Sequence, residues 1–242
     1  MKNNKLSKDQ TLFKKVNNIL AKSSYKYWVC HGTLLGIIRD KAILPWDHDI
    51  DFAVWKDEVK IEEIEKLFNL NGFHQEYIFG EMDCLHFVSE SKKIDISFYE
   101  KKNGLASIKW IAPNNKFKNK FFIFVAERLC APNNIKKSKF NFTSIKSFIR
   151  VLFSNFLISI YPFFSSKLKK KIFEYSQKYF NYIGYSYPEE LMQFKNIIFL
   201  EEQVPVPIDS EKCLFLTYGA DWKTPKKNYT WYKEAANLTK LS

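Results

Sequence analysis

Four aspartates are the residues of this sequence best suited to chemistry. Asp47, Asp49 and Asp51 occupy alternate positions, and isoleucine, phenylalanine and valine fill positions of the opposite parity. Because the side chains of a β-strand alternate between its two faces, a strand over 47–54 would present three carboxylates on one face and an apolar wall on the other. Asp95 lies between two isoleucines, so it is predicted to project from a second strand in the same way.

Carboxylates gathered in this way imply a divalent cation. Like charges on one strand face repel one another and destabilise a fold unless a counter-charge is present. Mg²⁺, or Mn²⁺ in its place, prefers carboxylate oxygens together with water and phosphate oxygens. Two ions bridged by shared carboxylates can hold the attacking and leaving oxygens of an in-line displacement at phosphorus. We therefore predict a metal site made by Asp47, Asp49, Asp51 and Asp95, with phosphoryl- or nucleotidyl-type transfer as its chemistry.

A turn and an arginine upstream of these aspartates are candidates for binding the phosphates of a substrate. Gly32 allows backbone N–H groups to approach a ligand closely, and Thr33 adds a hydroxyl. Arg39 offers a planar fork that suits a phosphate oxygen. A D-x-D pattern alone is often only a solvated turn. The order of a Gly-Thr turn, an Asp-Ile-Asp strand and a later Ile-Asp-Ile strand is, however, that of the nucleotidyltransferase fold.

The elements that must position these residues follow from periodicity and end signals. Ser7 and Gln10 form a predicted capping box ahead of a helix with apolar residues at helical spacing. Pro45 ends the segment that precedes the aspartate strand. The remaining predicted elements are a strand over 27–30, a short helix after Gly32, a helix over 59–70 that ends at Asn71-Gly72, and strands over 84–88 and 94–99.

Length and composition fit a single domain with an anionic partner. The chain has 242 residues, 46% of them hydrophobic, with only 7 glycines and 8 prolines, which argues against a linker-rich or disordered chain. We expect one α+β domain over 1–242, with a mixed β-sheet core flanked by helices and a largely helical insertion at about 115–190. The net charge of +12 implies binding to nucleic acid, a phosphorylated substrate or an acidic membrane face.

The cysteines and the first residues favour a cytoplasmic protein. The four cysteines have no paired spacing, so they predict neither a disulfide framework nor a paired-cysteine metal clasp. The first residues contain no apolar segment of the kind that a secretory signal needs. His74 and His86 are expected to be surface or satisfied core residues, because Cys84-x-His86 lacks the further ligands of a zinc site.

The segment 136–182 differs in character from the rest of the chain. Basic residues bracket the apolar stretch 148–164, which Arg150, Asn155 and Pro162 interrupt. The stretch falls short of the ~20 clean apolar residues that a membrane-spanning helix needs. The pattern fits an interfacial helix that binds an anionic membrane surface. A pair of basic-edged core helices is the alternative interpretation.

Three blocks of the sequence resemble the LicD/fukutin family, in the family's order and over less than half of the chain. A nucleotidyltransferase-like fold is implied by this resemblance. The resemblance also implies an activity, the transfer of a phospho-alcohol such as phosphocholine or a polyol phosphate from a CDP-activated donor, with release of CMP. The acceptor would be a hydroxyl of a cell-surface glycan or its lipid-linked precursor. The blocks are HGTLLGIIR and ILPWDHDIDF within 31–52, KIDISFY at 93–99, and FLEEQVPVP and FLTYGADWKTP within 198–226.

The resemblance also implies roles for individual residues. Asp49 and Asp51 would bind Mg²⁺, and Asp95 would be the third carboxylate, placed to orient or deprotonate the acceptor hydroxyl. Asp47 matches the first acid of the family block and would support the metal site from its edge. His48 stands where bacterial members commonly carry an acid, and its parity predicts that it points away from the carboxylates.

Two aromatic residues and the choice of function stay open. Tyr218 and Trp222, beside Gly219, would either stack on the cytosine ring or close the fold. A nucleotidyltransferase acting on RNA or a small nucleotide acceptor is the alternative enzyme, and a non-catalytic membrane-surface adaptor is a further alternative. Positive charge gathers around 148–164, which makes nucleic acid the less favoured partner, and a non-catalytic copy would have no reason to keep four repelling carboxylates. We expect a transferase peripheral to the inner face of the cytoplasmic membrane.

Overall fold

The computed structural model describes residues 6–131 and 144–240, and these divide into two compact units. Unit 1 is formed by the residues up to 76, by 81–110 and by those from 183 onward, and unit 2 by 77–80 and 111–182. The helical insertion expected at about 115–190 thus lies mainly in unit 2, whereas its last residues, from 183, lie in unit 1.

The described residues form helices, strands and three short 3₁₀ turns, with the turns at Tyr161–Phe163, Gln177–Tyr179 and Glu189–Leu191. The helices are α1 Lys8–Ala21, α2 His31–Leu35, followed by a π-helical turn at Gly36–Asp40, α3 Ile61–Leu70, α4 Phe117–Cys130, α5 Ile145–Ile160, α6 Ser166–Ser176, α7 Ser210–Tyr218 and α8 Trp231–Glu234. The strands are β1 Tyr27–Val29, β2 Asp49–Trp55, β3 His74–Glu76, β4 Cys84–Val88, β5 Lys93–Lys102, β6 Leu105–Ala112, β7 Asn181–Pro188, β8 Phe194–Phe199, β9 Glu202–Pro207 and β10 Leu238–Lys240.

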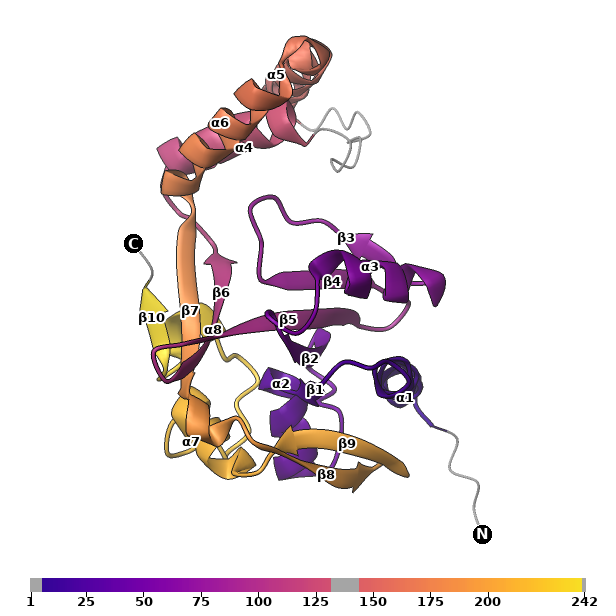
Figure 1. Ribbon diagram of the computed structural model, residues 1–242. Coiled ribbons are helices and arrows are strands. Elements are labelled where there is room, and N and C mark those ends of the chain that lie inside the picture. The colour runs from indigo at the N-terminus through magenta and orange to yellow at the C-terminus, as the bar shows by residue number, and fades with distance from the viewer. Residues whose placement is uncertain (1–5, 132–143, 241–242) are drawn as a thin grey trace. The chain divides into compact units, whose positions relative to one another are not determined.

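A mixed β-sheet is the centre of unit 1 (Figure 1). Its strand order is β1-β2-β5-β6-β7-β10, and β4, which carries β3 at its other edge, also pairs with β5. Strands β2 and β5 are parallel, whereas β1 with β2, β4 with β5 and β5 with β6 are antiparallel. Strand β5 pairs with β2 and β4 along its first part and with β6 at its end. The predicted α+β class with a mixed sheet core is confirmed.

One face of β2 and β5 lies in the larger of the two apolar core clusters of unit 1. Every second residue of each strand is apolar and completely buried, which confirms the alternation predicted from the sequence. The ring of Phe13, on α1, stacks on that of Phe52 at 5.5 Å between centroids and meets Phe199 of β8 edge-on at 5.2 Å. Burying one such ring stabilises the fold by roughly 1.5–3 kcal/mol. The buried residues of this face are Ile50, Phe52, Val54, Ile94, Ile96 and Phe98.

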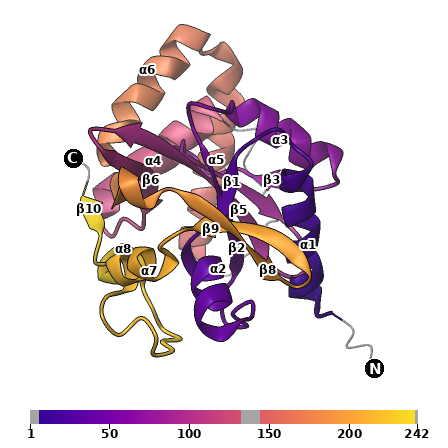
Figure 2. The same cartoon turned by 60° about the horizontal axis from the view of Figure 1, so that its bottom comes forward.

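Helix α1 begins where the sequence predicted. The Ser7 side chain accepts the Gln10 N–H and the Gln10 side chain accepts the Ser7 N–H, so the capping box is confirmed. The helix lies beside the β8–β9 hairpin (Figure 2), where the Asn17 amide donates to the Gln203 carbonyl at 3.2 Å. The Tyr27 hydroxyl lies 3.1 Å from the Asn17 side-chain oxygen, so this buried amide is bonded from two elements.

Some element bounds differ from the expected ones for local reasons. The aspartate strand begins at Asp49, so Asp47 stands in the loop before it. The helix expected over 59–70 begins at Ile61, because Lys60 has extended backbone angles and serves as its N-cap. The short helix after Gly32 continues as a π-helical turn and ends at Lys41, whose φ of 54° is left-handed.

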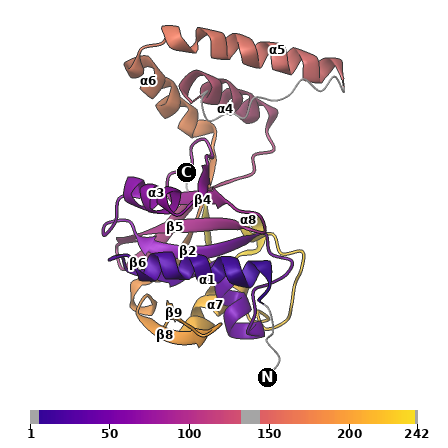
Figure 3. The ribbon, with the colours of Figure 1, turned by 90° about the vertical axis from the view of Figure 1, so that its right-hand side faces the viewer.

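Unit 2 is largely helical, as predicted. Helices α5 and α6 both lie against α4 (Figures 1 and 3). Within residues 6–131 and 144–240, none of the helices combines the length and the apolar character that crossing a bilayer requires. Three of the lysines that predicted a basic edge, Lys136, Lys137 and Lys139, lie outside the described residues.

Candidate active site

The parallel pairing of β2 with β5 brings the two aspartate motifs together. Asp51 is the register partner of Asp95, and Asp49 that of Lys93. The isoleucines on either side of Asp95 are completely buried in the core, so the aspartates project from the opposite face. Two motifs that are distant in sequence therefore meet on one sheet face.

Three carboxylates converge closely enough to share a metal ion. One oxygen each from Asp47, Asp49 and Asp51 lies within 4.8 Å of the other two. Asp51 is buried, whereas Asp47 and Asp49 are half-buried and open toward solvent. A donor set made only of carboxylate oxygens, with solvent on one side, suits a hard cation such as Mg²⁺ that keeps water and phosphate oxygens as further ligands.

The charge balance of this cluster also favours a cation. Burial raises the pKa of the Asp51 carboxyl well above its usual range, and the charges of Asp49, Asp47 and Asp95 raise it further. Burial likewise raises the pKa of Asp49, with the charges of Asp47 and Asp95 adding to it. Without a metal the cluster therefore retains protons that ordinary aspartates would release. A divalent cation would take the place of those protons.

The Gly-Thr turn of α2 positions these carboxylates. The Thr33 N–H and hydroxyl both donate to Asp51 Oδ2, at 3.3 Å each, and the Asp51 N–H donates to the Thr33 hydroxyl oxygen at 2.8 Å. A β-carbon at Gly32 would stand 2.0 Å from Asp47 Oδ2, so only glycine permits this approach. Phosphate binding by Gly32 and Thr33 stays a prediction.

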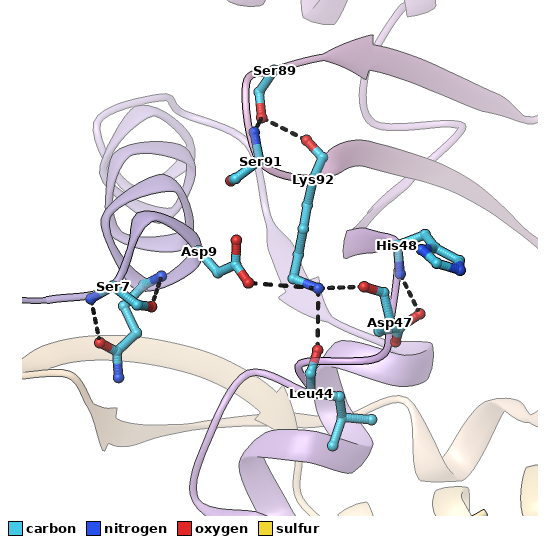
Figure 4. Close-up of polar contacts among 9 residues, drawn as sticks. Ser7, Asp9, Leu44, Asp47, His48, Ser89, Ser91 and Lys92 are labelled. Carbon is cyan, nitrogen blue, oxygen red and sulfur yellow. Dashed lines mark hydrogen bonds and ion pairs between the residues drawn. The ribbon is translucent and has the colours of Figure 1, made fainter. Parts of the chain in front are cut away.

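A buried lysine holds the loop that carries Asp47 (Figure 4). The Lys92 ammonium donates to the Leu44 carbonyl at 3.1 Å and, by a very short hydrogen bond, to the Asp47 carbonyl. It also forms an ion pair with Asp9 of α1 at 3.6 Å, and only 5% of Lys92 is exposed. Because a lysine is rarely buried unless it is paired, this side chain indicates a loop held in one place.

Asp95 belongs to a second group of side chains that the sequence did not predict. Its Oδ1 lies 2.8 Å from His86 Nδ1, and Cys84 Sγ is 4.0 Å from the same nitrogen. One atom each of these three residues falls within 4.8 Å of the others. Burial alone would lower the pKa of His86, but the hydrogen bond and charge of Asp95 outweigh it and raise the pKa. The expectation that His86 is a satisfied histidine holds only for Nδ1, whose partner is Asp95, because Nε2 is buried without a hydrogen-bond partner among the described residues.

The pairing of His86 with Asp95 could have been found from the sequence, whereas the role of Lys92 could not. The predicted strands 84–88 and 94–99 are joined by a short polar turn, and counting back from that turn sets His86 opposite Asp95, as observed. Lys92 lies in that turn, where a lysine normally indicates exposure. Its burial depends on contacts with distant segments.

The predicted phosphate-binding arginine has partners of its own. Arg39 Nε and Nη2 donate to the two carboxylate oxygens of Asp40 at 2.7 and 2.8 Å, and Nη1 donates to the Trp222 carbonyl at 3.3 Å. The side chain of Arg39 is only 7% exposed. Arg39 thus links the π-helical turn to the segment after α7. A phosphate would have to take the place of Asp40 on this fork.

The aromatic residues near Gly219 take different positions. Trp222 is buried in the core of unit 1, packed with the residues around β2 and β5. Tyr218 is half-buried, and its ring lies 4.9 Å from that of Tyr229. Trp222 therefore closes the fold, and Tyr218 is the better placed of the two for stacking. His48 lies in the loop, where its N–H donates to Asp47 Oδ1 at 3.0 Å.

His31, the first residue of the first resembling block, serves the structure. Its φ of 48° is left-handed, and its Nε2 lies 3.3 Å from the Tyr99 hydroxyl. The ring meets Trp110 and Tyr185 edge-on at 5.1 and 5.7 Å. Burial lowers the pKa of His31 to about 4, so the imidazole is neutral at physiological pH.

Part of the chain is similar to a described domain family. Residues 24–134 match the family model described as LicD/FKTN/FKRP, nucleotidyltransferase domain. An uncharacterized protein of Rickettsia prowazekii (strain Madrid E) is 36% identical over 67 residues, 27% of this chain and 25% of that protein. One of Rickettsia typhi (strain ATCC VR-144 / Wilmington) is 28% identical over 92 residues, 38% of this chain and 28% of that protein. The chain thus matches only about a quarter of either relative's length.

Solved structures of the antibiotic-resistance factor ANT(2'')-Ia align distantly with the chain. The solution structure is 10% identical in sequence, with a TM-score of 0.34. The alignment covers 69% of this chain and 88% of the chain in that structure. The crystal structure with adenylyl-2''-tobramycin is 11% identical in sequence, with a TM-score of 0.34. The alignment covers 71% of this chain and 98% of the chain in that structure.

All four aspartates of the candidate site lie inside the segment matched by the family model. The match supports an enzyme that transfers groups. The resemblance is thereby confirmed for the blocks within 31–52 and at 93–99, because residues 24–134 match the LicD/FKTN/FKRP nucleotidyltransferase domain, whereas the blocks within 198–226 lie outside the matched residues.

Proposed function

We propose that the chain is a metal-dependent transferase that moves a phospho-alcohol from a CDP-activated donor to a hydroxyl of a cell-surface glycan or its lipid-linked precursor, releasing CMP. The observation that carries this proposal is the meeting of Asp51 with Asp95 on one face of the sheet, beside Asp47 and Asp49. The domain match supports a transferase, and the choice of phospho-alcohol and donor rests on the family resemblance.

Asp47, Asp49 and Asp51 would hold Mg²⁺ or Mn²⁺, with Asp95 as the fourth carboxylate. When bound, the ion would neutralise charge on the donor phosphates and favour displacement at phosphorus. Thr33 would fix the Asp51 carboxylate through its two hydrogen bonds. Lys92 would hold the Asp47 loop in place, and Gly32 would leave room for the Asp47 side chain.

Asp95 would accept the proton of the acceptor hydroxyl. The acceptor oxygen would form a bond to the distal phosphorus of the donor, the phosphoanhydride bond would break, and CMP would leave with the bonding electrons. The proton would pass to the Asp95 carboxylate. His86, 2.8 Å from Asp95 Oδ1, would orient that carboxylate through its ring nitrogen.

The donor would be bound around this centre by Gly32, Arg39 and Tyr218. The Gly32 backbone would approach the phosphates, Thr33 would hold the Asp51 carboxylate beside them, and Arg39 would offer a guanidinium after exchange of its Asp40 partner. Tyr218 would stack on the cytosine ring, with Trp222 supporting the segment that carries it.

A panel of CDP-alcohols incubated with the protein, Mg²⁺ and extracted glycolipid tests this function. We expect CMP release with at least one donor, abolished by chelation and by Asp51→Asn. Nucleoside triphosphates with RNA or a nucleotide acceptor form the second arm. Pyrophosphate release in that arm, without CMP release in the first, would favour the nucleotidyltransferase alternative and refute the proposal.

A further inference from the structure

Helix α5 carries an apolar stripe on its outer side. Ile145, Ile149, Leu152 and Phe156 recur at intervals of three or four residues and so occupy one face of the helix. Their exposed fractions are 79%, 59%, 50% and 58%. Large apolar side chains at these exposures form a continuous row, whereas scattered single ones would need no explanation.

The inner side of the same helix packs on α4 through both apolar and polar contacts, and the ring of Phe153 lies 6.1 and 6.3 Å from those of Phe121 and Phe124. Ser154 accepts a hydrogen bond from Arg128 Nε of α4 at 2.8 Å. The Arg128 guanidinium lies over the ring of Phe124, 3.3 Å from its centroid. Leu157 is the only residue of α5 that is fully buried. These contacts engage one side of α5 and leave the row from Ile145 to Phe156 exposed.

Unit 2 also carries the entire excess positive charge of the chain. The sequence has 38 Lys and Arg and 26 Asp and Glu. Residues 77–80 and 111–182 contain 14 of the basic residues and 2 of the acidic ones, so this unit has the full net charge of +12. The rest of the chain therefore has equal numbers of basic and acidic residues. Helix α5 contains no acidic residue, and α6 adds the exposed Lys167, Lys170 and Lys171.

From these observations we propose that the outer face of α5 docks on the surface of a bilayer that contains anionic lipid. Such a surface accepts an apolar row into its headgroup region and attracts lysines with its charge. Nucleic acid would match the charge but not the row of Ile, Leu and Phe. A second copy of the chain would match the row but would bring a like charge of +12 toward it. For a cytoplasmic protein, the surface is the inner face of the cytoplasmic membrane.

The proposal is independent of the transfer reaction, because vesicle binding is measured without substrate. The full chain is sedimented with vesicles of phosphatidylcholine alone and of phosphatidylcholine with phosphatidylglycerol. We expect binding to the mixed vesicles and much weaker binding to the neutral ones. Leu152→Glu with Phe156→Glu should lower the partition coefficient roughly tenfold or more, since it places two charges in the apolar row.

Matched variants separate this surface from general effects of charge. Leu70→Glu with Ile198→Glu makes the same change at apolar residues of unit 1 that are 76% and 72% exposed, and should leave binding near that of the parent. Lys167, Lys170 and Lys171→Glu should also reduce binding roughly tenfold or more. Exchanging the exposed unit 1 lysines Lys22, Lys60 and Lys66 for Glu should have a much smaller effect.

Three outcomes would overturn the proposal. The first is a parent protein that does not sediment with mixed vesicles. The second is a Leu152→Glu, Phe156→Glu variant that binds them as the parent does. The third is a parent that dimerises through this face, seen by analytical ultracentrifugation as a dimer that the same variant converts to monomer while vesicle binding is unchanged.

Discussion

Asp51 and Asp95 are direct neighbours on two parallel strands, each flanked by residues that are buried in the core. This register joins a motif near the start of the chain to one that follows β3 and β4. Parallel pairing requires a long connection between the strands, so the site exists only when the intervening α3, β3 and β4 have folded. The chemistry proposed here depends on that pairing.

Neutralising Asp49 should stabilise the metal-free protein in a pH-dependent manner. The pKa values of Asp49 and Asp51 are raised in the fold, chiefly by burial. The stability that these carboxyls contribute is therefore complete below about pH 4 and is lost as the pH rises through the raised values. We expect Asp49→Asn to unfold at a higher temperature than the parent at about pH 8 in chelator, with the difference vanishing near pH 4.

Calorimetry in chelator at both pH values measures this effect. Asp57→Asn, at an exposed position of unit 1, is the control and should show no such pH-dependent difference. With Mg²⁺ present the order should reverse at about pH 8, because the parent gains the energy of metal binding. An Asp49→Asn variant that is less stable than the parent in chelator at the higher pH would contradict the repulsion argument.

Adding one methyl group at Gly32 should act through Asp47. The new β-carbon would meet Asp47 Oδ2 at 2.0 Å, and that oxygen lies at the end of a side chain that can rotate away. We expect Gly32→Ala to fold but to bind Mn²⁺ less tightly, by roughly tenfold. In a double-mutant cycle with Asp47→Asn the two effects should not add, since both remove the same ligand. Additive losses would show that Gly32 acts elsewhere.

Removing the buried ammonium of Lys92 should loosen the Asp47 loop. Lys92→Met removes the donor of the Asp47 carbonyl and one of the two donors of the Leu44 carbonyl, which costs about 1–3 kcal/mol of unfolding free energy. Lys93→Met removes a lysine whose side chain is 52% exposed and is paired with Glu76, and should cost less than about 1 kcal/mol. Urea denaturation of the two variants makes the comparison. Equal losses of unfolding free energy in the two variants would mean that the buried hydrogen bonds of Lys92 stabilise the fold no more than the exposed ion pair of Lys93 does.

Exchanging His86 should slow turnover without weakening donor binding. His86→Gln removes the imidazole that contacts Asp95, and Asp95 then loses its fixed orientation. We expect kcat for CMP release to fall roughly 10-fold or more, with KM for the donor little changed. His74→Gln, at an exposed position of β3, is the matched control and should leave both constants near those of the parent. A rise in KM with unchanged kcat would assign His86 to substrate binding instead.

The sequence predicted the residues that local patterns determine. Alternation fixed the faces of β2 and β5, and the capping box fixed the start of α1. The contacts that it did not reveal are those between distant segments. Lys92 is buried because Leu44, Asp47 and Asp9, which are distant in sequence, contact it. Arg39 is paired with Asp40 in a π-helical turn that the spacing of apolar residues does not predict.

Local sequence patterns did not determine which side of α5 faces α4. An apolar helix with basic flanks fits both a core and a surface, so the sequence left both interpretations open for 136–182. In the structure, Ile145 and Phe156 of α5 are exposed, whereas Leu157 is buried and Ser154 accepts a hydrogen bond from Arg128. Which side of a helix faces its neighbour depends on the packing of α4, and that information is not local.

The most direct test of the central claim is metal binding by the four aspartates as one site. Mn²⁺ binding is measured by electron paramagnetic resonance, in the presence of CMP, for the parent, for Asp51→Asn, for Asp95→Asn and for the exposed control Asp57→Asn. If the β2–β5 pairing forms a single metal site, both site variants should lose affinity by at least about tenfold while the control binds as the parent does. An Asp95→Asn variant that binds Mn²⁺ as tightly as the parent would contradict the account.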